Sequence, residues 1–541
     1  MATKFDFIIV GAGSAGCILA NRLSESGRHH VLLIEAGGEA KGTWFKWPLG
    51  YVKNYFNPAA NWMFHSTPQA HLQDRNMYVP RGKVLGGSGA INAMIYVRGQ
   101  PQDFDDWRDA GNPGWGFDDV FPFFQQLETH PLGERVGRST QGPIHIAPMN
   151  GRTHPICNDF FAACQSMNLS RTDDFNGKQF EGYGAYEANI RRGQRSSSGV
   201  EYLQPVRARQ NLTVMTHTHV KHLLFAPNAP QQISGVRVVH EGHELDLFAH
   251  REVILSAGAV GSPQLLQCSG IGEAAWLKKI GVDVHHDLPS VGQHLQDHLC
   301  VSFFYRANRP TLNDELSSWV GKLRAGLQYV FKREGPLAMS VNQTGGFVKG
   351  DPRLRQPNLQ LYFNPMSYAI PASTKASLQP DPYPGFLMAF NACRPTSQGE
   401  IRIHSPDSKH APLIDPAYLS TTLDQEEALQ GMHVLRRISQ MAALQQLTSA
   451  EVKPGLKVAS DEALMDYFKA NCNSIYHLCG SCAMGPDPAN SVVDAQLKVH
   501  GTKGLRVIDA SVFPNITSGN INAPTMMVAE KGAALVQAQH G

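Results

Sequence analysis

Residues 5–36 read FDFIIVGAGSAGCILANRLSESGRHHVLLIEA, and this stretch decides the fold class. The apolar, partly β-branched run at 5–10 predicts a buried strand of a parallel sheet. A glycine-rich turn follows at 11–16, and then a helical pattern that ends at Gly27. The run HHVLLI predicts a second strand, which leads into Glu35. Strand, glycine turn, helix, strand and acid in this order predict a Rossmann-like dinucleotide-binding unit in an α/β fold.

The residue types in this unit suit a pyrophosphate and a ribose. Glycine permits a tight turn and a close approach of the backbone to the pyrophosphate, which rests on the N-terminus of the following helix. Glu35 can accept hydrogen bonds from the hydroxyls of the adenosine ribose. A turn that needs glycine only for packing is the alternative, and this unit alone does not separate FAD from NAD. The predicted contacts are Gly11, Gly13, Ser14, Ala15, Gly16, Glu35 and Ala36.

The composition limits the other classes of function. The 541 residues are 42% hydrophobic and 17% charged, which is typical of a globular chain with a large core. The formal net charge is +2 without a long basic block, so nucleic acid is not an expected partner. The chain shows no run of about 18 apolar residues and no signal-peptide pattern. Its nine cysteines are sparse, and we therefore expect a cytoplasmic protein without a transmembrane segment.

Four further segments carry a family resemblance. Residues 80–105 read PRGKVLGGSGAINAMIYVRGQPQDFD, and residues 257–272 read AGAVGSPQLLQCSGIG. Near the end stand LRVIDASVFP at 505–514 and GNINAPTMMVAEKGAAL at 519–535. Together with the N-terminal unit and the Tyr-His pair at 476–477, they resemble the glucose-methanol-choline (GMC) family of FAD-dependent oxidoreductases. Within that family the chain is most similar to the bacterial alcohol dehydrogenase and choline dehydrogenase branch.

The resemblance covers residues 5 to about 538 and implies FAD as the cofactor. Contacts from segments as distant as 11–16 and 509–525 also require a long, extended cofactor, which FAD is. Some relatives attach FAD through a histidine in the glycine-rich loop, and Ile91 stands at that place here, so we expect non-covalent FAD. The further cofactor-binding residues that the resemblance implies are Arg81, Val84, Gly87, Asn92, Ala93, Met94, Val220, Ala257, Gly258, Tyr476, Asp509, Ala510, Pro524 and Thr525.

A second domain follows from the character of the later chain. The strand-like runs LQLYFNPMSYA, GFLMAFNACRP and GEIRIHSP, with the helical run LDQEEALQGMHVLRRISQMAALQQL after them, predict an α+β substrate domain built on an antiparallel sheet. We expect the Rossmann-like FAD-binding domain to comprise residues 1–154, 196–299 and 471–541. The substrate domain is expected to comprise residues 155–195 and 300–470.

The oxidation of an alcohol at a flavin moves a hydride from the α-carbon to flavin N5, and the hydroxyl must lose its proton. A neutral imidazole is suited to take that proton, and such a base typically raises the rate by about 10²–10⁴. The family has such a histidine where His477 stands, and it has a partner side chain that we match to Asn522. We therefore expect His477 to be the general base and Asn522 to bind the substrate oxygen. A structural role for His477, and capping of the helix that contains Pro524 for Asn522, are the alternatives.

Cys479 and Cys482 form a Cys-x-x-Cys pair beside His477. Such a pair supplies at most two zinc ligands, and no matching second half occurs in the chain. Haem attachment needs the order CxxCH, and thioredoxin-like exchange needs a different fold. We expect both cysteines to be packing residues and we expect no metal site. Leu478 and Cys479 stand where Pro and Val are common in the family. The resemblance therefore does not determine the shape of the pocket.

Segment 44–64 is rich in aromatic residues: eight of its 21 residues are Phe, Trp or Tyr, against 9% in the whole chain. A lid over the substrate mouth, an apolar dock for a membrane quinone and ordinary packing all stay open for it. The candidate substrate-lining residues are Trp62, Asn342, Tyr362 and Phe363. A quaternary ammonium needs an aromatic cage with an acid, which we do not identify, so an uncharged primary alcohol is favoured over choline.

The sequence thus predicts an FAD-dependent alcohol dehydrogenase that passes electrons to a quinone or another acceptor. One alternative is an alcohol oxidase, which reduces oxygen to hydrogen peroxide. An FAD-containing hydroxynitrile lyase, which cleaves its substrate without net oxidation, is a second alternative from another class. Peripheral contact with a membrane stays open.

Overall fold

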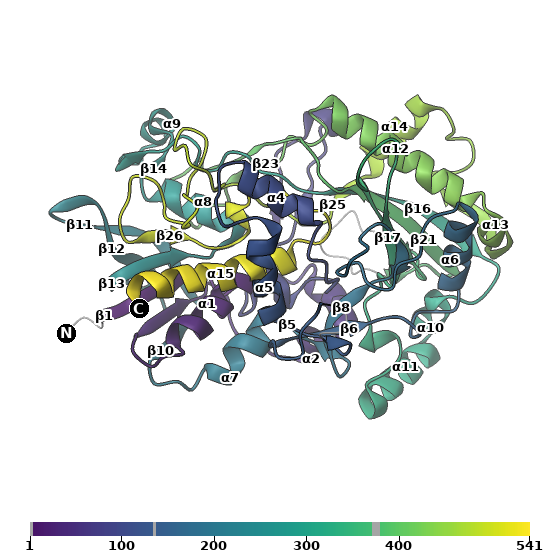
Figure 1. The fold of residues 1–541 in the computed structure, drawn as a ribbon, viewed down its shortest axis with the longest axis horizontal. Helices are drawn as coiled ribbons and strands as arrows, with labels where there is room; N and C mark the ends of the chain where they lie inside the picture. The colour runs from purple at the N-terminus through teal and green to yellow at the C-terminus, as the bar shows by residue number, and fades with distance from the viewer. Residues whose placement is uncertain (1–3, 134–136, 370–378) are drawn as a thin grey trace.

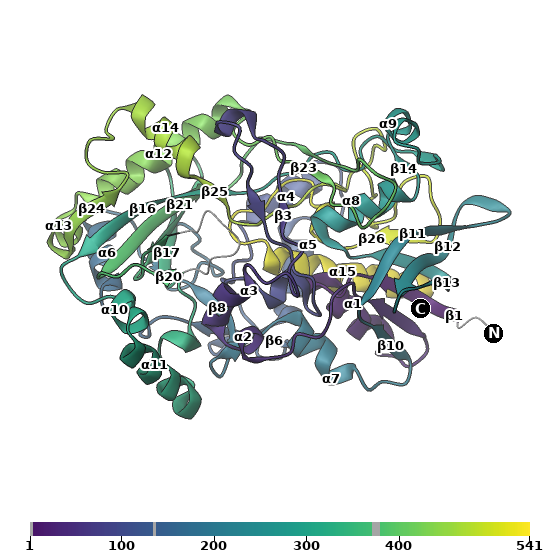
Figure 2. The ribbon, with the colours of Figure 1, turned by 180° about the vertical axis from the view of Figure 1, so that it is seen from behind.

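The computed structural model describes residues 4–133, 137–369 and 379–541, which form an elongated molecule with a large β-sheet in each half (Figures 1 and 2). The first sheet has seven strands. Its order is β10 (Leu212–Met215), β2 (Val31–Ile34), β1 (Lys4–Val10), β13 (His243–Leu255), β12 (Ala229–His240) and β11 (Thr218–Ala226), and β26 (Leu505–Val507) also pairs with β13.

The central part of the first sheet is parallel. β10, β2, β1, β13 and β26 run in the same direction, with Phe7 opposite Val31 and Val10 opposite Leu255. Helix α1 (Ser14–Ser24) follows β1 after the glycine turn and packs against α15 (Asn522–His540). β13 also pairs antiparallel with β12, which in turn pairs with β11. The Rossmann-like unit predicted from the N-terminal sequence is confirmed.

The second sheet is antiparallel at every strand pair. Its order is β24 (Thr448–Lys453), β16 (Leu299–Ala307), β21 (Gly385–Ala392), β18 (Leu359–Asn364), β17 (Thr344–Val348) and β7 (Gly182–Ala185), and β25 (Asn473–Ser474) also pairs with β16. The predicted antiparallel sheet of a second α+β unit is therefore confirmed. Its edge strand β7 comes from much earlier in the chain than the other strands.

Helices cover one face of the second sheet and leave the other face toward the first half. The covering helices are α6 (Cys157–Ser166), α12 (Thr422–Ser439), α13 (Ala442–Leu447) and α14 (Asp461–Asn471). Under them, Phe363 and Phe390 pack with Met432 in one apolar core. Because side chains alternate along a strand, the neighbouring Tyr362 and Ala389 point to the opposite face.

Shorter elements connect and flank the two sheets. β22 (Glu400–Arg402) and β23 (Leu413–Asp415) pair with each other and pack on α8 (Gly258–Cys268). The run GEIRIHSP therefore forms a strand but, contrary to the prediction, does not join the second sheet. The remaining α-helices are α2 (Thr43–Lys46), α3 (Tyr51–Asn54), α4 (Pro101–Asp109), α5 (Phe117–Leu127), α7 (Gln204–Val206), α9 (Ala274–Lys279), α10 (Leu312–Ser317) and α11 (Trp319–Lys332). The remaining strands are β3 (Phe64–His65), β4 (Tyr78–Val79), β5 (Glu128–Thr129), β6 (Ile144–Pro148), β8 (Glu187–Arg191), β9 (Gln194–Arg195), β14 (Ile271–Gly272), β15 (His286–Asp287), β19 (Tyr368–Ala369) and β20 (Gln379–Pro380). Within the described ranges, no helix is both long and apolar enough to cross a bilayer.

Candidate active site

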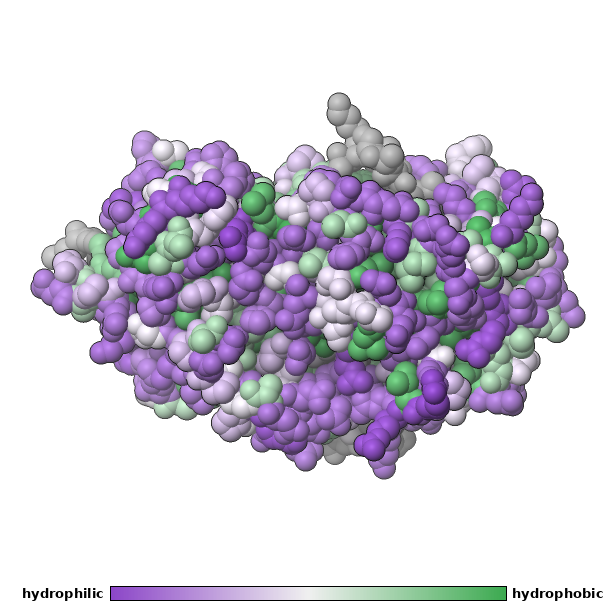
Figure 3. Space-filling model, turned by 90° about the horizontal axis from the view of Figure 1, so that it is seen from above, coloured by the Kyte–Doolittle hydropathy of each residue, from purple (hydrophilic) through white to green (hydrophobic). Residues whose placement is uncertain are grey.

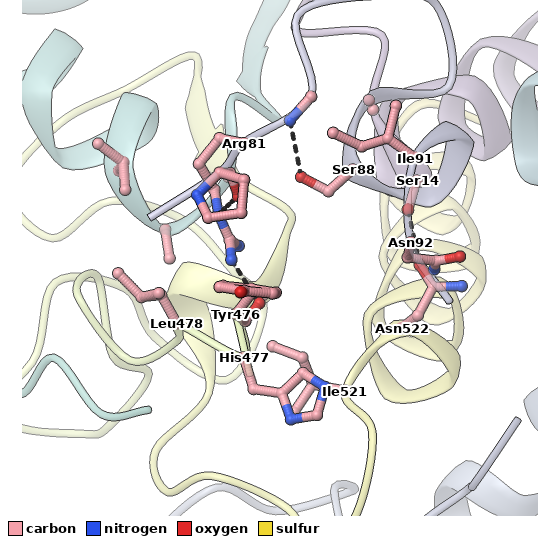
Figure 4. Close-up of a pocket in the computed structure, with 18 of the residues that line it drawn as sticks. Ser14, Arg81, Ser88, Ile91, Asn92, Tyr476, His477, Leu478, Ile521 and Asn522 are labelled. Atoms are coloured by element: carbon pink, nitrogen blue, oxygen red, sulfur yellow. Dashed lines mark hydrogen bonds between the residues drawn. The ribbon is translucent and has the colours of Figure 1, made fainter. Parts of the chain in front are cut away.

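A cavity of about 450 Å³ is lined by residues of both halves, including Val10 of the first sheet and Ser302 of the second. Most of the predicted site residues meet there. Those that line it are Gly11, Gly13, Ser14, Ala15, Glu35, Ala36, Trp62, Arg81, Gly87, Asn92, Ala93, Met94, Val220, Ala257, Gly258, Asn342, Tyr362, Tyr476, His477, Asp509, Ala510, Asn522 and Thr525. Figure 4 shows Ser14, Asn92 and Asn522 on one side of the view and Arg81, Tyr476 and Leu478 on the other.

Four predicted residues are not brought to the cavity wall: Gly16, Val84, Pro524 and Phe363. Gly16 serves the packing of α1, because an added Cβ would lie 1.8 Å from the carbonyl oxygen of Gly11. Val84 belongs to a small apolar cluster, and Pro524 is buried in the first turn of α15. Phe363 lies under the covering helices, where its ring stacks on Phe160 with 5.1 Å between centroids. The prediction that both Tyr362 and Phe363 line the pocket is wrong for Phe363, because neighbouring residues on a strand point to opposite faces of the sheet.

The glycine turn between β1 and α1 forms the nucleotide end of the cavity. Gly11 has a φ of +100°, and an added Cβ would lie 2.5 Å from the carbonyl oxygen of Ser256. At Gly13, by contrast, the nearest atoms to an added Cβ are 4.0 Å away, and Gly13 lines the cavity. Backbone N–H groups of a helix N-terminus that line a cavity, without a side chain in front of them, suit a pyrophosphate.

Glu35 lies at the same end, at the carboxyl end of β2. Its Oε2 accepts a hydrogen bond from the backbone N–H of Ala12 at 3.0 Å, and its Oε1 accepts one from Gly37 at 2.8 Å. Burial raises the pKa of Glu35 to about 7, although these hydrogen bonds oppose the shift. Each oxygen of a carboxyl group has a second lone pair, so Glu35 can still accept hydrogen bonds from a ribose.

A buried carboxyl group organises the opposite, reaction end. Asp297 Oδ1 accepts hydrogen bonds from the backbone N–H groups of His477 at 2.6 Å and His298 at 2.9 Å. Its Oδ2 accepts hydrogen bonds from the Ser474 hydroxyl and, at 2.6 Å, from the Tyr418 hydroxyl. Burial raises the pKa of Asp297, and the hydroxyl donors oppose this shift. Asp297 thereby ties the chain before the candidate base to the start of β16.

The backbone before the candidate base has an unusual conformation. Tyr476 has a φ of +72°, in the left-handed region that side chains other than glycine rarely adopt. Its N–H donates to the Ser474 hydroxyl at 2.8 Å, and its carbonyl oxygen accepts a hydrogen bond from the Arg81 guanidinium. These contacts offset a cost of about 1–2 kcal/mol for the left-handed turn. The turn directs the next side chain, His477, along the cavity (Figure 4).

Two buried histidines fix the proton position on the candidate base. His298 Nε2 lies 2.9 Å from the carbonyl oxygen of Cys393, which can only accept, so Nε2 carries the proton. Burial lowers the pKa of His298 to about 4, so its Nδ1 is bare. His477 Nδ1, at 2.9 Å from that Nδ1, must therefore donate. Burial and the nearby His298 and Arg81 lower the pKa of His477 well below its ordinary value, which leaves its Nε2 bare as well.

The amide beside the bare nitrogen belongs to Asn520, not to Asn522. Asn520 Nδ2 lies 3.2 Å from His477 Nε2, and its Oδ1 accepts a hydrogen bond from Gln360 Nε2 at 3.2 Å. The expected pairing of His477 with Asn522 is therefore corrected. Asn522 is the first residue of α15, and its Oδ1 accepts a hydrogen bond from the Ser14 hydroxyl at 2.8 Å. Ile521, the residue between them, has a φ of −80° and a ψ of 1°, so the chain turns into α15 there and the two amides have different partners.

Sequence reasoning missed Asn520, Asp297, His298 and Gln360. Asn520 stands in the quoted segment GNINAP, where two amides two residues apart look equivalent. The run HLQDHL contains the adjacent Asp297 and His298, and an acid beside a histidine was the available signal. Gln360 lies within a strand-like run, and no sequence signal marks it.

The Cys-x-x-Cys pair lies in the main apolar core of the first half. Cys479 and Cys482 are fully buried free thiols. Burial raises the pKa of both thiols well above the ordinary value, which keeps them protonated and poorly reactive. Within the described part of the chain, no group of three His, Cys, Asp or Glu side chains could hold a metal ion.

Segment 44–64 divides between the cavity wall and packing. Tyr51, Tyr55 and Trp62 line the cavity, together with Phe64 at the end of the segment. Trp47 instead packs on Tyr329 of α11, with 4.8 Å between ring centroids. The segment therefore contributes both to the pocket and to the contact with α11.

Comparisons with known proteins show which family the chain belongs to. The sequence matches the GMC oxidoreductase family over residues 5–300 for the N-terminal part and 395–529 for the C-terminal part. It is 39% identical over 540 residues to the oxygen-dependent choline dehydrogenase of Photobacterium profundum, which covers 98% of this chain and 93% of that protein. It is 38% identical over 537 residues to the alcohol dehydrogenase (acceptor) of Pseudomonas putida, which covers 98% and 95%. A structure of Aspergillus oryzae formate oxidase, studied for FAD modification, matches with a TM-score of 0.91 at 27% identity and covers 99% of each chain.

The chain belongs to the GMC oxidoreductase family, and it is a flavoprotein that acts on CH–OH donors. The cavity fits the FAD of this family. An added Cβ at Gly13 would be in ordinary van der Waals contact at 4.0 Å, and an added Cβ at Gly258 would meet no atom within 4 Å, so the backbone there is open to a ligand. Glu35 offers acceptors for a ribose, and the N-termini of α1 and α15 both reach the cavity through Ser14 and Asn522.

Proposed function

We propose that the protein oxidises a primary alcohol to an aldehyde with His477 as the general base. The observation that carries the proposal is the bare Nε2 of His477, which lies at the cavity beside the amide of Asn520. FAD, when bound, supplies the acceptor for the hydride of the carbinol carbon. An alcohol hydroxyl placed between the two side chains gives its proton to Nε2, while Asn520 Nδ2 donates a hydrogen bond to the developing alkoxide.

The charge of the cavity favours an uncharged alcohol. Glu35 and Asp509 are the carboxyl groups among the described residues that line it. Both are held by backbone N–H groups, and Asp509 accepts from Gly258 at 2.8 Å and from Ser511 at 2.7 Å. The wall around His477 instead carries aromatic and amide side chains. A choline cation would have aromatic rings there but no carboxylate partner, so choline is the weaker substrate despite the choline dehydrogenase relative.

FAD is proposed to bind without a covalent link. Ile91 lines the cavity in the glycine-rich loop and offers no nucleophilic atom to the ring. Acid denaturation should therefore release the yellow cofactor into the supernatant. Flavin that stays with the precipitated protein would contradict this.

Electrons are proposed to leave to a quinone or another organic acceptor. Oxygen is the second candidate, because the comparisons include a formate oxidase and an oxygen-dependent dehydrogenase. The ratio of hydrogen peroxide to aldehyde in air separates the two. A ratio near zero supports the organic acceptor, and a stoichiometric ratio supports the oxidase.

An anaerobic screen tests the reaction itself. Uncharged primary alcohols, aliphatic and aromatic, are mixed with the FAD-loaded protein, and the flavin absorbance is followed. Bleaching by these alcohols, faster than by choline, is the expected result. A flavin that stays oxidised with every alcohol would remove the redox function and favour a lyase, which a hydroxynitrile cleavage assay would then detect.

A further inference from the structure

Helix α11 carries an apolar face that the fold leaves uncovered. Trp319 is 75% exposed and Phe331 is 80% exposed. Four more apolar side chains of the helix, Val320, Leu323, Leu327 and Val330, are between 50% and 57% exposed. Single exposed apolar residues are common on protein surfaces, but six on one helix form a patch of the kind that marks an interaction site.

The six side chains lie on the side of the helix that does not pack on the protein. At 100° per residue they fall within an arc of about 120°. Ala325 and Tyr329 are buried on the other side, and the Tyr329 hydroxyl donates to the carbonyl oxygen of Gly193 at 2.9 Å. The helix is thus already anchored, and its exposed face is available to something outside the chain.

Positive charges flank this face. Lys322 and Arg324 are exposed beside the face, Lys332 is exposed on the opposite side of the last turn, and Arg333 caps the helix. The helix sequence contains no acidic residue, and the exposed acidic residues nearest in sequence are Glu315 and Glu334. None of these four cations lies within ion-pair distance of a carboxylate among the residues that the structure describes, and Arg324 interacts with Glu315 only at longer range, where it opposes the rise that burial gives the pKa of Glu315. An apolar face bordered by exposed cations is complementary to a lipid surface with anionic headgroups. In a pairing of two α11 helices, these like charges would lie close together.

We propose that α11 docks on an anionic lipid membrane and lies in its headgroup region. Fourteen residues span about 21 Å at 1.5 Å per residue, which is shorter than the roughly 30 Å hydrocarbon core. The helix therefore rests on the bilayer. Figures 1 and 2 both show it at the lower edge of the molecule, with α2 along the same edge. Figure 3 looks onto the opposite edge, where polar residues predominate and hydrophobic ones are scattered.

Packing links this surface to the cavity. Ala325 of α11 shares an apolar cluster with Tyr51 and Tyr368, and both tyrosines line the cavity. Trp44 of α2 is 46% exposed, and its ring lies 5.4 Å from that of Trp47, which packs on α11. Docking would thus bring the cavity wall next to the lipid. The docking of α11 does not depend on the proposed function. The further step, in which an apolar alcohol or a quinone reaches the cavity from the lipid, rests on the proposed function.

Vesicle sedimentation of the FAD-loaded, full-length protein tests the proposal. The vesicles contain phosphatidylcholine alone or phosphatidylcholine and phosphatidylglycerol in equal amounts. The wild type should sediment with the mixed vesicles and much less with neutral ones. Combined Trp319→Gln, Leu323→Gln and Phe331→Gln substitutions should lower the bound-to-free ratio about tenfold or more. Lys322→Gln with Arg324→Gln should weaken the preference for the anionic vesicles.

A matched variant controls for the general loss of surface apolarity. Combined Leu245→Gln, Leu423→Gln and Leu456→Gln substitutions also remove three exposed apolar side chains, and they should leave sedimentation unchanged. Flavin content and the melting temperature confirm that each variant is folded. A wild type that stays in solution with both vesicles, or an α11 variant that binds like the wild type, overturns the proposal. A wild-type dimer that the α11 variant makes monomeric, without vesicle binding, overturns it in favour of a second copy. The assay needs no alcohol, so its outcome is independent of the proposed reaction.

Discussion

The two ends of the cavity are built in different ways. The nucleotide end is a short contiguous stretch in which backbone atoms and the absence of side chains at Gly11 and Gly13 shape the site. The reaction end consists of side chains from distant segments, and His298 and His477 are 179 residues apart in sequence. At the nucleotide end, a substitution that adds a side chain fills space that the ligand needs. At the reaction end, a substitution that removes one side chain interrupts a series of hydrogen bonds, so every partner in that series matters.

This contrast predicts that the two ends fail differently on substitution. Changes at the nucleotide end should lower the affinity for FAD, while turnover of the loaded protein changes little. Changes at the reaction end should slow flavin reduction and leave FAD bound.

The largest effect is expected at His477. His477→Ala removes the proton acceptor and should slow anaerobic flavin reduction by about 10²–10⁴, with unchanged FAD content. Stopped-flow absorbance measures the rate. His404→Ala, at an exposed histidine, serves as the control and should reduce at the wild-type rate. Near-normal reduction in the His477 variant would remove it as the base.

The two neighbouring amides should differ from each other. Asn520→Ala removes the donor beside His477 Nε2 and should lower kcat by about 10², as loss of an oxyanion donor does. Asn522→Ala removes the acceptor for the Ser14 hydroxyl and should lower kcat by no more than about fivefold, which corresponds to the loss of one neutral hydrogen bond. Steady-state kinetics with one alcohol compare them. A larger loss at Asn522 than at Asn520 would reverse the assignment.

His298 is a positioning residue, and its test is the pH profile. The base must be neutral, so activity falls as pH drops through the pKa of His477, which burial places well below its ordinary value. His298→Ala admits water and removes a neighbour that lowers the pKa of His477, so this pKa should rise. The acid limb of kcat/KM should therefore move to higher pH. We also expect kcat to fall about 10–100-fold, because the imidazole loses the partner that orients it. His298→Asn keeps an acceptor for the Nδ1 proton and should recover part of the loss. An unshifted acid limb in the Ala variant would mean that His298 only fills space.

A modest effect, on FAD binding and not on turnover, is expected at Gly13. Gly13→Ala fits the protein, because its Cβ would stay 4.0 Å from the nearest atoms, but it fills space needed for the pyrophosphate. We expect about tenfold weaker FAD binding, or about 1.4 kcal/mol, by titration of the apoprotein. Gly326→Ala, where an added Cβ meets no atom within 4 Å, is the control and should bind FAD normally. Unchanged affinity in the Gly13 variant would place the pyrophosphate elsewhere.

The sequence predicted the parts of the site that depend on local pattern. The glycine turn and Glu35 lie within one strand-turn-helix-strand unit, so their spacing alone indicates how they lie in space. The prediction that Phe363 lines the pocket was wrong, because the sequence of a strand does not show which of its alternating residues face the pocket. The prediction that Asn522 is the amide beside His477 was corrected, because the position where α15 begins decides which amide turns toward the imidazole. That position depends on packing against the rest of the molecule.

The sequence by itself determined the α/β class and the dinucleotide-binding unit, because periodicity and glycine spacing act over a few residues. FAD as the cofactor and His477 as the candidate base were implied by the resemblance of its motifs to the GMC family. The tertiary structure alone decided that His477 carries its proton on Nδ1, that Asn520 lies beside its Nε2 and that the apolar face of α11 is uncovered. The physical reason is that a proton position and a solvent-exposed face depend on partners that the fold brings together from distant parts of the chain.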